Sequence, residues 1–291
     1  MTTLKAFNYP DPGAFLERVR HGLEQHEATN SLMLGILFHA TREPRAAAQG
    51  IINVAVEDGE AWRLAAIMMP TRPLLLSAAT HPSDHAIEAL AAHLQEMEAP
   101  VTAVVAPVSL ARAFAEAWSQ RIGCNFEVRF QQRIHRLTEV RVPVNHSGLL
   151  RIATDRDIEL VAQWFLEFDI EALNEHDADR ARERAIERVS GGVVYLWDDG
   201  EPRAMAMRVR TTTHTASIGG VYTPPQWRGN GHATAAVAQL SRQLLHQGYA
   251  MCVLYTDLAN PVSNSIYRRI GYEPVMDSDH IVFHSRSDSA G

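Results

Sequence analysis

The chain has 291 residues, of which 46% are hydrophobic and 21% are charged, and its formal net charge is −7. This is the composition of a globular protein with one large or two ordinary domains. The acidic balance excludes a general binder of nucleic acid or of anionic membranes, because such a protein would carry a basic stripe.

Signals for export, membrane insertion and metal binding are weak in this sequence. Residues 1–13 contain no apolar signal core, and the longest apolar runs are too short to span a membrane, so we expect a cytoplasmic protein. Cys124 and Cys252 lie far apart without metal-like spacing, and we expect buried free thiols rather than a disulfide. His81 and His85 have no third ligand nearby, so no metal site is predicted.

The first half shows an order of elements that returns later in the chain. Its patterns predict a helix over 81–98, a strand over 100–107, a helix over 109–123 and strands within 125–137. The same order recurs in residues 230–284. Both short helices end in Arg-Ile-Gly, at Arg121-Ile122-Gly123 and Arg269-Ile270-Gly271. These features indicate a weak internal repeat at the scale of a domain.

The second half is predicted to alternate helices and strands. Thr154 and Asp157 form a capping-box-like pair at the start of a helix over 153–168, and a more polar helix covers 176–192. The later patterns predict two strands within 193–210, a strand over 214–223, a helix after Gly231 that Gly248 ends, a strand over 250–258, a short helix over 260–272 and strand material over 273–285. A turn-rich stretch near 139–150 separates two expected domains, 1–140 and 148–285.

A glycine-containing loop joins the strand over 214–223 to the helix that follows it. The start of a helix carries about four unpaired N–H groups and a partial positive charge, and it binds phosphate without needing a cationic side chain. Gly229, Gly231 and Ala233 leave the backbone accessible, and Arg228 adds a permanent charge. We therefore predict an anion cradle. The alternative is a turn that needs glycine only for positive φ, since neither the ATPase phosphate loop nor the full dinucleotide fingerprint occurs.

Two motifs in this half resemble those of the GNAT superfamily of acyl-CoA-dependent N-acyltransferases. Residues 228–233, Arg-Gly-Asn-Gly-His-Ala, fit its Arg/Gln-x-x-Gly-x-Gly/Ala loop, and Pro225 stands where a proline often precedes it. Residues 260–272 fit its later segment Asn-x-x-Ala-x-x-x-Tyr-x-x-x-Gly-Phe, with Ser263 in place of alanine and Tyr272 in place of phenylalanine. The resemblance covers roughly residues 148–285.

The resemblance implies a fold, a cofactor and a set of contacts. The fold is α+β, with two GNAT-like domains that each contain a mixed, mostly antiparallel sheet flanked by helices. The first domain is then a degenerate copy without the cofactor loop, although an unrelated α/β domain is an alternative. Acetyl-CoA would lie between two splayed strands as the acyl donor. The implied cofactor contacts are Val221, Tyr222, Thr223, Arg228, Gly229, Asn230, Gly231, His232, Ala233, Thr234, Asn260 and Ser263.

The implied reaction is attack of a neutral amine on the thioester, with Tyr267 as the general acid for the leaving thiolate. The backbone N–H near Val221 would bind the oxyanion. A phenol of ordinary pKa near 10 protonates a thiolate of pKa near 8.5 only if it is held close. The alternatives without a role in catalysis or binding are a packing role for Tyr267, a capping role for Asn260 and a surface charge for Arg228. The candidates for the base are Glu167, Asp169, Glu171, Glu175 and His214.

These features favour an acetyl-CoA-dependent N-acetyltransferase that acts on an amine. The acidic segment near Glu167 indicates a cationic acceptor, either a small molecule or a peptide. A non-catalytic acyl-CoA sensor is the alternative from another class, and it would have no need for a positioned acid. The sequence predicts a monomer or homodimer. It does not identify the acceptor, the acyl chain length or the base.

Overall fold

The structure is a computed structural model that describes residues 4–42, 50–79, 83–141, 147–173 and 175–285. The chain divides into two compact units, which are described separately. The first unit contains Met1–His135, Tyr255–Asn260 and Pro274–Gly291, and the second contains Arg136–Leu254 and Pro261–Glu273. The chain therefore leaves the first unit and returns to it twice.

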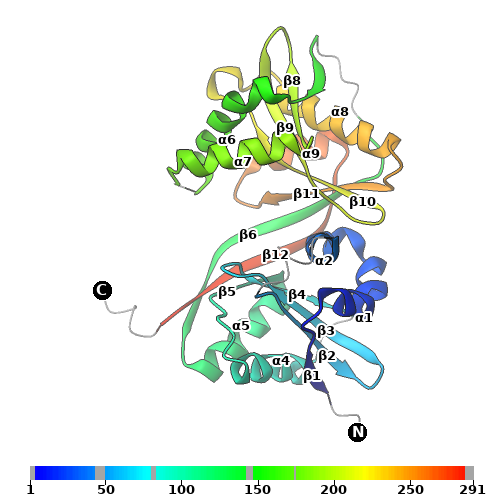
Figure 1. Ribbon diagram of the computed structural model, residues 1–291, viewed down its shortest axis with the longest axis vertical. Coiled ribbons are helices and arrows are strands. Elements are labelled where there is room, and N and C mark those ends of the chain that lie inside the picture. The colour runs from blue at the N-terminus through cyan, green and yellow to red at the C-terminus, as the bar shows by residue number, and fades with distance from the viewer. Residues whose placement is uncertain (1–3, 43–49, 80–82, 142–146, 174, 286–291) are drawn as a thin grey trace. The chain divides into compact units, whose positions relative to one another are not determined.

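The first unit is built on a mixed sheet with helices on both faces (Figure 1). Its strands are, in spatial order, β1 (Lys5–Asn8), β2 (Ile52–Asp58), β3 (Ala61–Met68), β4 (Leu74–Ala78), β5 (Ala103–Pro107), β12 (Glu273–His284) and β6 (Asn125–Leu137). Neighbouring strands from β1 to β4 are antiparallel, β4 and β5 are parallel, and β12 is antiparallel to β5.

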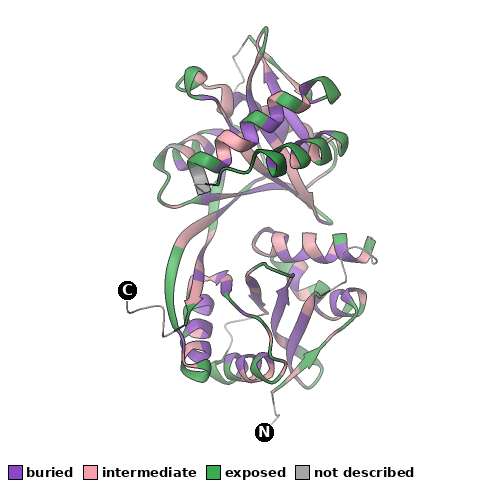
Figure 2. Ribbon diagram, turned by 60° about the vertical axis from the view of Figure 1, so that its left-hand side comes forward, coloured by how far each residue is buried: buried purple, intermediate pink, exposed green. Residues whose placement is uncertain are grey.

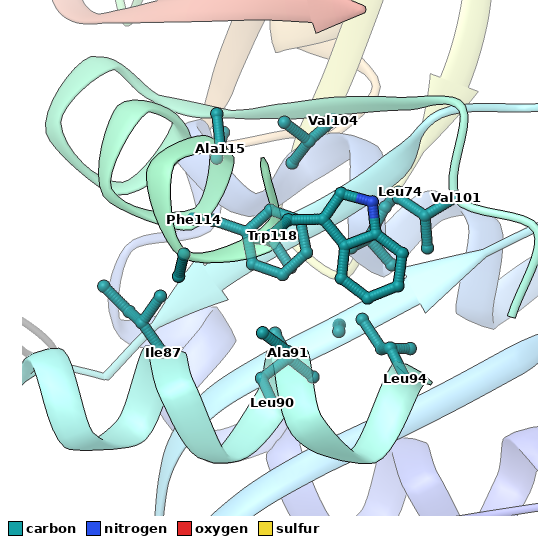
Figure 3. Close-up of a cluster of buried hydrophobic side chains, with 14 of the residues drawn as sticks. Leu74, Ile87, Leu90, Ala91, Leu94, Val101, Val104, Phe114, Ala115 and Trp118 are labelled. Atoms are coloured by element: carbon teal, nitrogen blue, oxygen red, sulfur yellow. The ribbon is translucent and has the colours of Figure 1, made fainter. Parts of the chain in front are cut away.

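Two helix pairs cover the sheet of the first unit. Helices α1 (Pro12–Gln25) and α2 (Glu27–Arg42) pack on one face, around Phe15, Leu34 and Trp62. Helices α4 (Asp84–Glu96) and α5 (Val108–Ile122) pack on the other face. Figure 3 shows how Phe114 and Trp118 of α5 meet Leu90 and Leu94 of α4 in that core. The apolar residues recur at helical spacing on each helix, which is why each buries one face.

The second unit has the same plan. Its strands lie in the order β11 (Met251–Asp257), β10 (Thr215–Tyr222), β9 (Pro202–Thr211), β8 (Val194–Asp198) and β7 (Leu149–Ile152). The last three residues of β11, from Tyr255 onward, belong to the first unit. Helices α6 (Ile158–Leu173) and α7 (Ala178–Ser190) cover one face. Helices α8 (His232–His246) and α9 (Pro261–Ile270) cover the other. Strands β8 and β10 are largely buried, whereas β7 and much of β9 are partly exposed, and Figure 2 shows both buried and exposed stretches on the helices.

The internal repeat predicted from the sequence is confirmed. The order β4, α4, β5, α5, β6 in the first unit matches β10, α8, β11, α9, β12 later in the chain. In both series the first and third elements form a parallel pair, β4 with β5 and β10 with β11. Both Arg-Ile-Gly sequences end a helix, and Gly123 and Gly271 adopt positive φ of 72° and 115°. The predicted strand material over 125–137 is a single strand, β6.

The closing strand β12 belongs to the sheet of the first unit. It pairs antiparallel with β5, from Ser278–Pro107 to Val282–Ala103. The carboxylate of Asp279 is fully buried, and it accepts hydrogen bonds from Arg112 at 2.8 Å and Gln131 at 2.7 Å. The division into domains 1–140 and 148–285 remains a prediction, and the compact units cut the chain at other places.

Cys124 and Cys252 are buried and form no disulfide, as predicted. Burial raises the pKa of the Cys252 thiol to about 12. Within the described residues no helix is long and apolar enough to cross a membrane. Those residues also contain no group of three or more histidine, cysteine, aspartate or glutamate side chains that would hold a metal ion. His85 is exposed, and His81 lies outside the described residues.

Candidate active site

The parallel strands β10 and β11 of the second unit separate part of the way along their length. Their ladder runs from Thr215–Met251 to Ile218–Leu254 and stops there. Beyond that point β10 continues to Tyr222 beside β9 alone, with Tyr222 opposite Met205. The far edge of β10 is then open over the predicted contact segment Val221–Thr223. A ligand with amide groups can pair with such an edge as an added strand.

A bulge turns β10 away from β11 at the point predicted from its glycine pair. Between Gly219 and Tyr222 the strand has one residue more than the facing segment of β9, which runs from Met207 to Met205. Gly220 adopts a φ of 56°, and a Cβ atom on it would lie 2.1 Å from the Cε atom of Met207. The end of the Met207 side chain could move aside, so the positive φ is the stronger reason for glycine at this position.

The loop after β10 presents backbone at the start of α8. A short 3-10 turn over Pro225–Trp227 leads to Gly229 and Gly231, which have φ of 80° and 79°. A Cβ atom on Gly229 would meet nothing within 4 Å, so the space beside the loop is open. Gly231 is the N-cap of α8, and no side chain caps the helix. The first-turn residues His232, Ala233 and Thr234 are partly exposed, so their N–H groups are suited to an anion.

The polar side chains of the loop stabilise its shape. Arg228 donates to both carboxylate oxygens of Glu171 at 2.7 and 2.8 Å and to the carbonyl oxygen of Thr223 at 2.8 Å. Asn230 donates to the carbonyl oxygens of Trp227 and Arg228, both at 3.3 Å. Because Glu171 offsets the charge of Arg228, the main attraction for an anion at this loop is its backbone.

The role of the Tyr222 side chain is not apparent from the sequence. Its ring is buried among the aromatic residues Trp164 and Phe168 of α6, and its hydroxyl donates to Glu167 at 3.0 Å and to Glu171 at 3.1 Å. Burial and these two carboxylates raise the pKa of Tyr222 far above the ordinary value. The phenol therefore stays protonated and holds two carboxylates at the end of β10.

The four carboxylates proposed as bases have different partners. Asp169 is buried and paired with Arg184 at 2.7 Å, Glu171 is paired with Arg228, and Glu175 is paired with Arg180 at 3.4 Å. Glu167 accepts only from neutral donors, Gln163 at 2.9 Å and Tyr222. Among the described residues, Glu167 is thus the one of these four carboxylates with no cationic partner. Its charge is available to a substrate.

His214 is placed far from the bulge. It lies in the turn before β10, where its carbonyl oxygen accepts from the backbone of Ala250 at 2.8 Å. Strands rise about 3.3 Å per residue, so the five residue steps from His214 to Gly219 span about 16 Å. We therefore drop His214 from the candidates for the base.

Tyr267 lies on α9, in the same hydrophobic cluster as Ile218 of β10, Ala236 of α8 and Leu254 of β11. The residue is 8% exposed, and its ring meets that of Tyr272 edge-on at 6.0 Å. Within the part of the chain that the structure describes, no hydrogen-bond partner of its hydroxyl contributes to its pKa, and that oxygen is not among the fully buried atoms that lack a partner. Burial raises the pKa of Tyr267 to about 12. The phenol is therefore a neutral donor near the splayed strands.

The remaining predicted cofactor contacts flank α9. Asn260 directly precedes the helix, and its N–H donates to the carbonyl oxygen of Asp257 at 3.1 Å. Ser263 lies one turn before Tyr267 on the helix and is partly exposed. The structure therefore groups the bulge, the glycine loop and Tyr267 around the parallel strand pair of the second unit.

The second unit has the fold of an acyltransferase, with a splayed strand pair beside a glycine-lined helix start. Residues 158–272 match the model of the family described as "Acetyltransferase (GNAT) family", and this part of the chain is a GNAT acetyltransferase domain. A comparison with curated proteins gives no significant sequence match.

Solved structures resemble the chain over nearly its whole length. One is a GNAT-family acetyltransferase from Colwellia psychrerythraea, with 12% identity, coverage of 97% of this chain and 100% of that chain, and a TM-score of 0.56. Another is a GCN5-related N-acetyltransferase from Sphaerobacter thermophilus, with 14% identity, coverage of 96% and 94%, and a TM-score of 0.63. A tandem GNAT protein from the clavulanic acid biosynthesis pathway has 15% identity, coverage of 97% and 98%, and a TM-score of 0.55. These similarities confirm the predicted fold of two GNAT-like domains.

Proposed function

We propose that the second unit transfers an acetyl group from acetyl-CoA to an amine. The observation that carries this proposal is the uncapped start of α8, with open space at Gly229, directly after the bulge in β10. A pyrophosphate suits such a helix start. The backbone edge over Val221–Thr223 then suits the amide groups of the pantetheine arm. Asn260 and Ser263 are proposed contacts to the same arm.

Three groups of the chain would carry the reaction. Glu167 accepts a proton from the arriving ammonium, which leaves a neutral amine that can attack the thioester carbonyl. The N–H near Val221 donates to the oxygen as negative charge develops there, a contribution of about 10²–10³ in rate. Tyr267 gives its proton to the sulfur as the C–S bond breaks. The proton that the attacking nitrogen then loses restores the phenol through solvent.

The acceptor is inferred from charge. Glu167 has no cationic partner among the described residues and is held by Tyr222 at the end of β10. An unpaired carboxylate attracts a cation, and a primary amine is a cation at neutral pH. We therefore propose a cationic small-molecule amine or a peptide amine as the acceptor.

The experiment that tests this proposal is a calorimetric titration with acetyl-CoA, followed by an assay of thiol release with a panel of amines. Gly229→Asn places a side chain in the open space beside the loop, and asparagine tolerates positive φ better than other residues. Gly200→Asn is a matched control, because Gly200 has the same φ of 80° and also meets nothing within 4 Å.

We expect one acetyl-CoA site per chain. Gly229→Asn should lower its affinity for acetyl-CoA by about tenfold or more, and Gly200→Asn should leave that affinity unchanged. Equal affinities in both variants would mean that the glycines only shape a turn. Binding without thiol release for any amine in the panel would favour the non-catalytic sensor instead.

A further inference from the structure

The first unit contains a pocket of about 480 Å³ where its own parallel strands separate. The ladder between β4 and β5 includes only Leu74–Val104 and Leu75–Val105. Beyond it, Ser77 and Ala78 of β4 and Ala106 and Pro107 of β5 line the pocket, with α2 forming another wall. All the lining residues belong to the first unit. An apolar cavity of about 150 Å³ already holds benzene, so this pocket has room for a larger organic molecule.

The wall of this pocket carries almost no charge. The described residues that line it include no lysine, arginine, aspartate or glutamate, and His26 is the only titratable side chain besides Tyr255. Most of the others are leucine, valine, alanine, isoleucine and methionine. An ionised ligand would lose its hydration here without gaining a counter-charge, which is strongly unfavourable.

Two polar pairs are placed in this apolar wall. The hydroxyl of Ser77, 5% exposed, donates to the amide oxygen of Asn30 at 2.7 Å, and the amide nitrogen of Asn30 donates to the carbonyl oxygen of Leu23 at 3.0 Å. On another wall, the hydroxyl of Tyr255 lies 3.2 Å from that of Ser31, which is buried behind the wall and does not itself line the pocket. Ser77 retains acceptor lone pairs, and the Asn30 amide has a second N–H donor. The pocket therefore offers hydrogen bonds to a neutral polar group.

The helix that follows β4 differs from its counterpart α8 at its start. Ser83 caps α4, and its hydroxyl accepts from the N–H of Ala86 at 3.4 Å. Asp84 occupies the first turn. A capped helix start with a carboxylate repels a phosphate, whereas the start of α8 has neither feature. This contrast argues against a second CoA in the first unit.

We infer that the gap between β4 and β5 is a second ligand site, which binds an uncharged, mostly apolar small molecule that carries one hydrogen-bonding group. The inference does not depend on acetyl transfer in the second unit. It assigns the first unit a binding role of its own, at the position where the second unit would hold the acyl donor.

A pair of fluorescent probes tests the class of ligand. N-phenylnaphthylamine is uncharged and has a single N–H donor, and anilinonaphthalene sulfonate has the same body with an added anionic group. The full-length protein is titrated with each probe, alone and in the presence of saturating acetyl-CoA. We expect one site for the neutral probe, no displacement by acetyl-CoA, and binding of the sulfonate weaker by about a hundredfold or more.

Two variants locate the site. Ala78→Leu fills part of the pocket and is expected to lower the affinity for the neutral probe by about tenfold or more. Ala113→Leu on α5 is the matched control, since Ala113 is also partly buried but does not line the pocket. Ser77→Ala removes the hydroxyl with little change in volume and is expected to weaken the same probe by about three- to tenfold.

Three results would overturn the inference. They are equal binding of the two probes, displacement of the neutral probe by acetyl-CoA, and unchanged affinity in both Ala78→Leu and Ser77→Ala. Thermal unfolding of every variant is recorded in parallel. If Ala78→Leu does not fold, Ser77→Ala still decides the location.

Discussion

Tyr267 and Tyr272 are neighbouring buried phenols with different surroundings. Their rings are 6.0 Å apart, and both have a pKa raised by burial. The hydroxyl of Tyr272 lies 2.9 Å from that of Ser241 and so has a partner inside the protein. The hydroxyl of Tyr267 has no partner among the described residues. The Tyr267 hydroxyl is therefore free to hydrogen-bond a ligand, whereas that of Tyr272 is already engaged inside the protein.

Tyr267→Phe is therefore expected to lower turnover by about 10²-fold or more while the affinity for acetyl-CoA and the melting temperature change little. Tyr272→Phe is the control, because it loses the contact with Ser241 and should cost about 1 kcal/mol of stability with little effect on turnover. The measurements are steady-state kinetics, calorimetry with acetyl-CoA and thermal unfolding. Full turnover in Tyr267→Phe would remove Tyr267 from the proposed mechanism.

Glu167 is distinguished from its neighbours by its lack of a cationic partner. Glu167→Gln keeps a side chain of the same size but neither attracts an ammonium nor accepts its proton. We expect turnover to fall by about 10²–10⁴-fold, with acetyl-CoA affinity preserved. Glu175→Gln is the matched control, since Glu175 is exposed and already paired with Arg180. A recovery of the variant at high pH, where the amine is already neutral, would support the role of base. Equal loss in both variants would contradict it.

At the residue scale, short motifs revealed the loop but not the carboxylate network. Gly229, Gly231 and Tyr267 each stand inside a local pattern whose chemistry is readable along the chain. The contact of Tyr222 with Glu167 joins residues 55 positions apart. Its existence depends on how α6 lies across β10, which no local pattern specifies. The acidity of the segment indicated a cationic acceptor, but only the partners of each carboxylate single out Glu167.

At the element scale, an ion pair with Arg151 stabilises the capping box before α6 in addition to its own hydrogen bonds. The carboxylate of Asp157 accepts from the N–H and the hydroxyl of Thr154 at 2.8 and 2.9 Å, as predicted from the sequence. It also accepts from two nitrogens of Arg151 on β7, at 2.8 and 2.9 Å. Arg151 and these bonds hold the pKa of Asp157 at about 2. The cap thus fixes the start of α6, the helix that carries Glu167.

Asp157→Asn is expected to lower the free energy of unfolding by about 1–2 kcal/mol at neutral pH, a value reduced because Arg151 is partly exposed. The folded pKa of Asp157 lies below the unfolded value near 4, so its contribution is present above about pH 4 and is lost as the pH falls toward 2. Denaturant unfolding across pH measures this. Asp155→Asn, at an exposed neighbour, is the control. A stability difference that persists at pH near 2 would contradict the assigned ion pair.

From residue 81 onward the helices and strands were largely predictable, because each has a periodic apolar face and clear end signals. The elements within residues 1–80 were not predicted. Residues 153–168 begin at the Thr154–Asp157 cap, and α9 stops at Gly271, whose φ is 115°. The bulge was also readable, from the glycine pair Gly219-Gly220. The patterns did not specify which strands lie side by side. Residues 273–285 have a clear strand pattern, but such a pattern does not identify the neighbouring strand in the sheet.

At the scale of the whole molecule, the pairing partner of the closing strand changes where the first domain ends along the chain. The closing strand β12 pairs with β5 and buries Ile281 and Asp279 completely, so the last segment of the chain completes the first unit. Phe283, which also lies on β12, packs against Phe114 of α5, with 6.5 Å between the ring centroids. The sequence motifs place all recognisable chemistry in the second half, and yet the first unit depends on residues that follow those motifs.

Shortening the chain to end at Glu273 is therefore expected to unfold the first unit, although every residue of the second unit remains. Loss of Ile281 burial alone costs about 1.5–3 kcal/mol, a large share of the 5–15 kcal/mol that typically stabilises a domain. A chain that ends at Ser285 is the control, because it retains all of β12. Limited proteolysis with mass spectrometry shows where cleavage begins, and we expect early cuts within residues 4–135 of the shorter chain only. If residues 1–140 alone melt cooperatively, the first half is an independent domain that does not require β12 between β5 and β6.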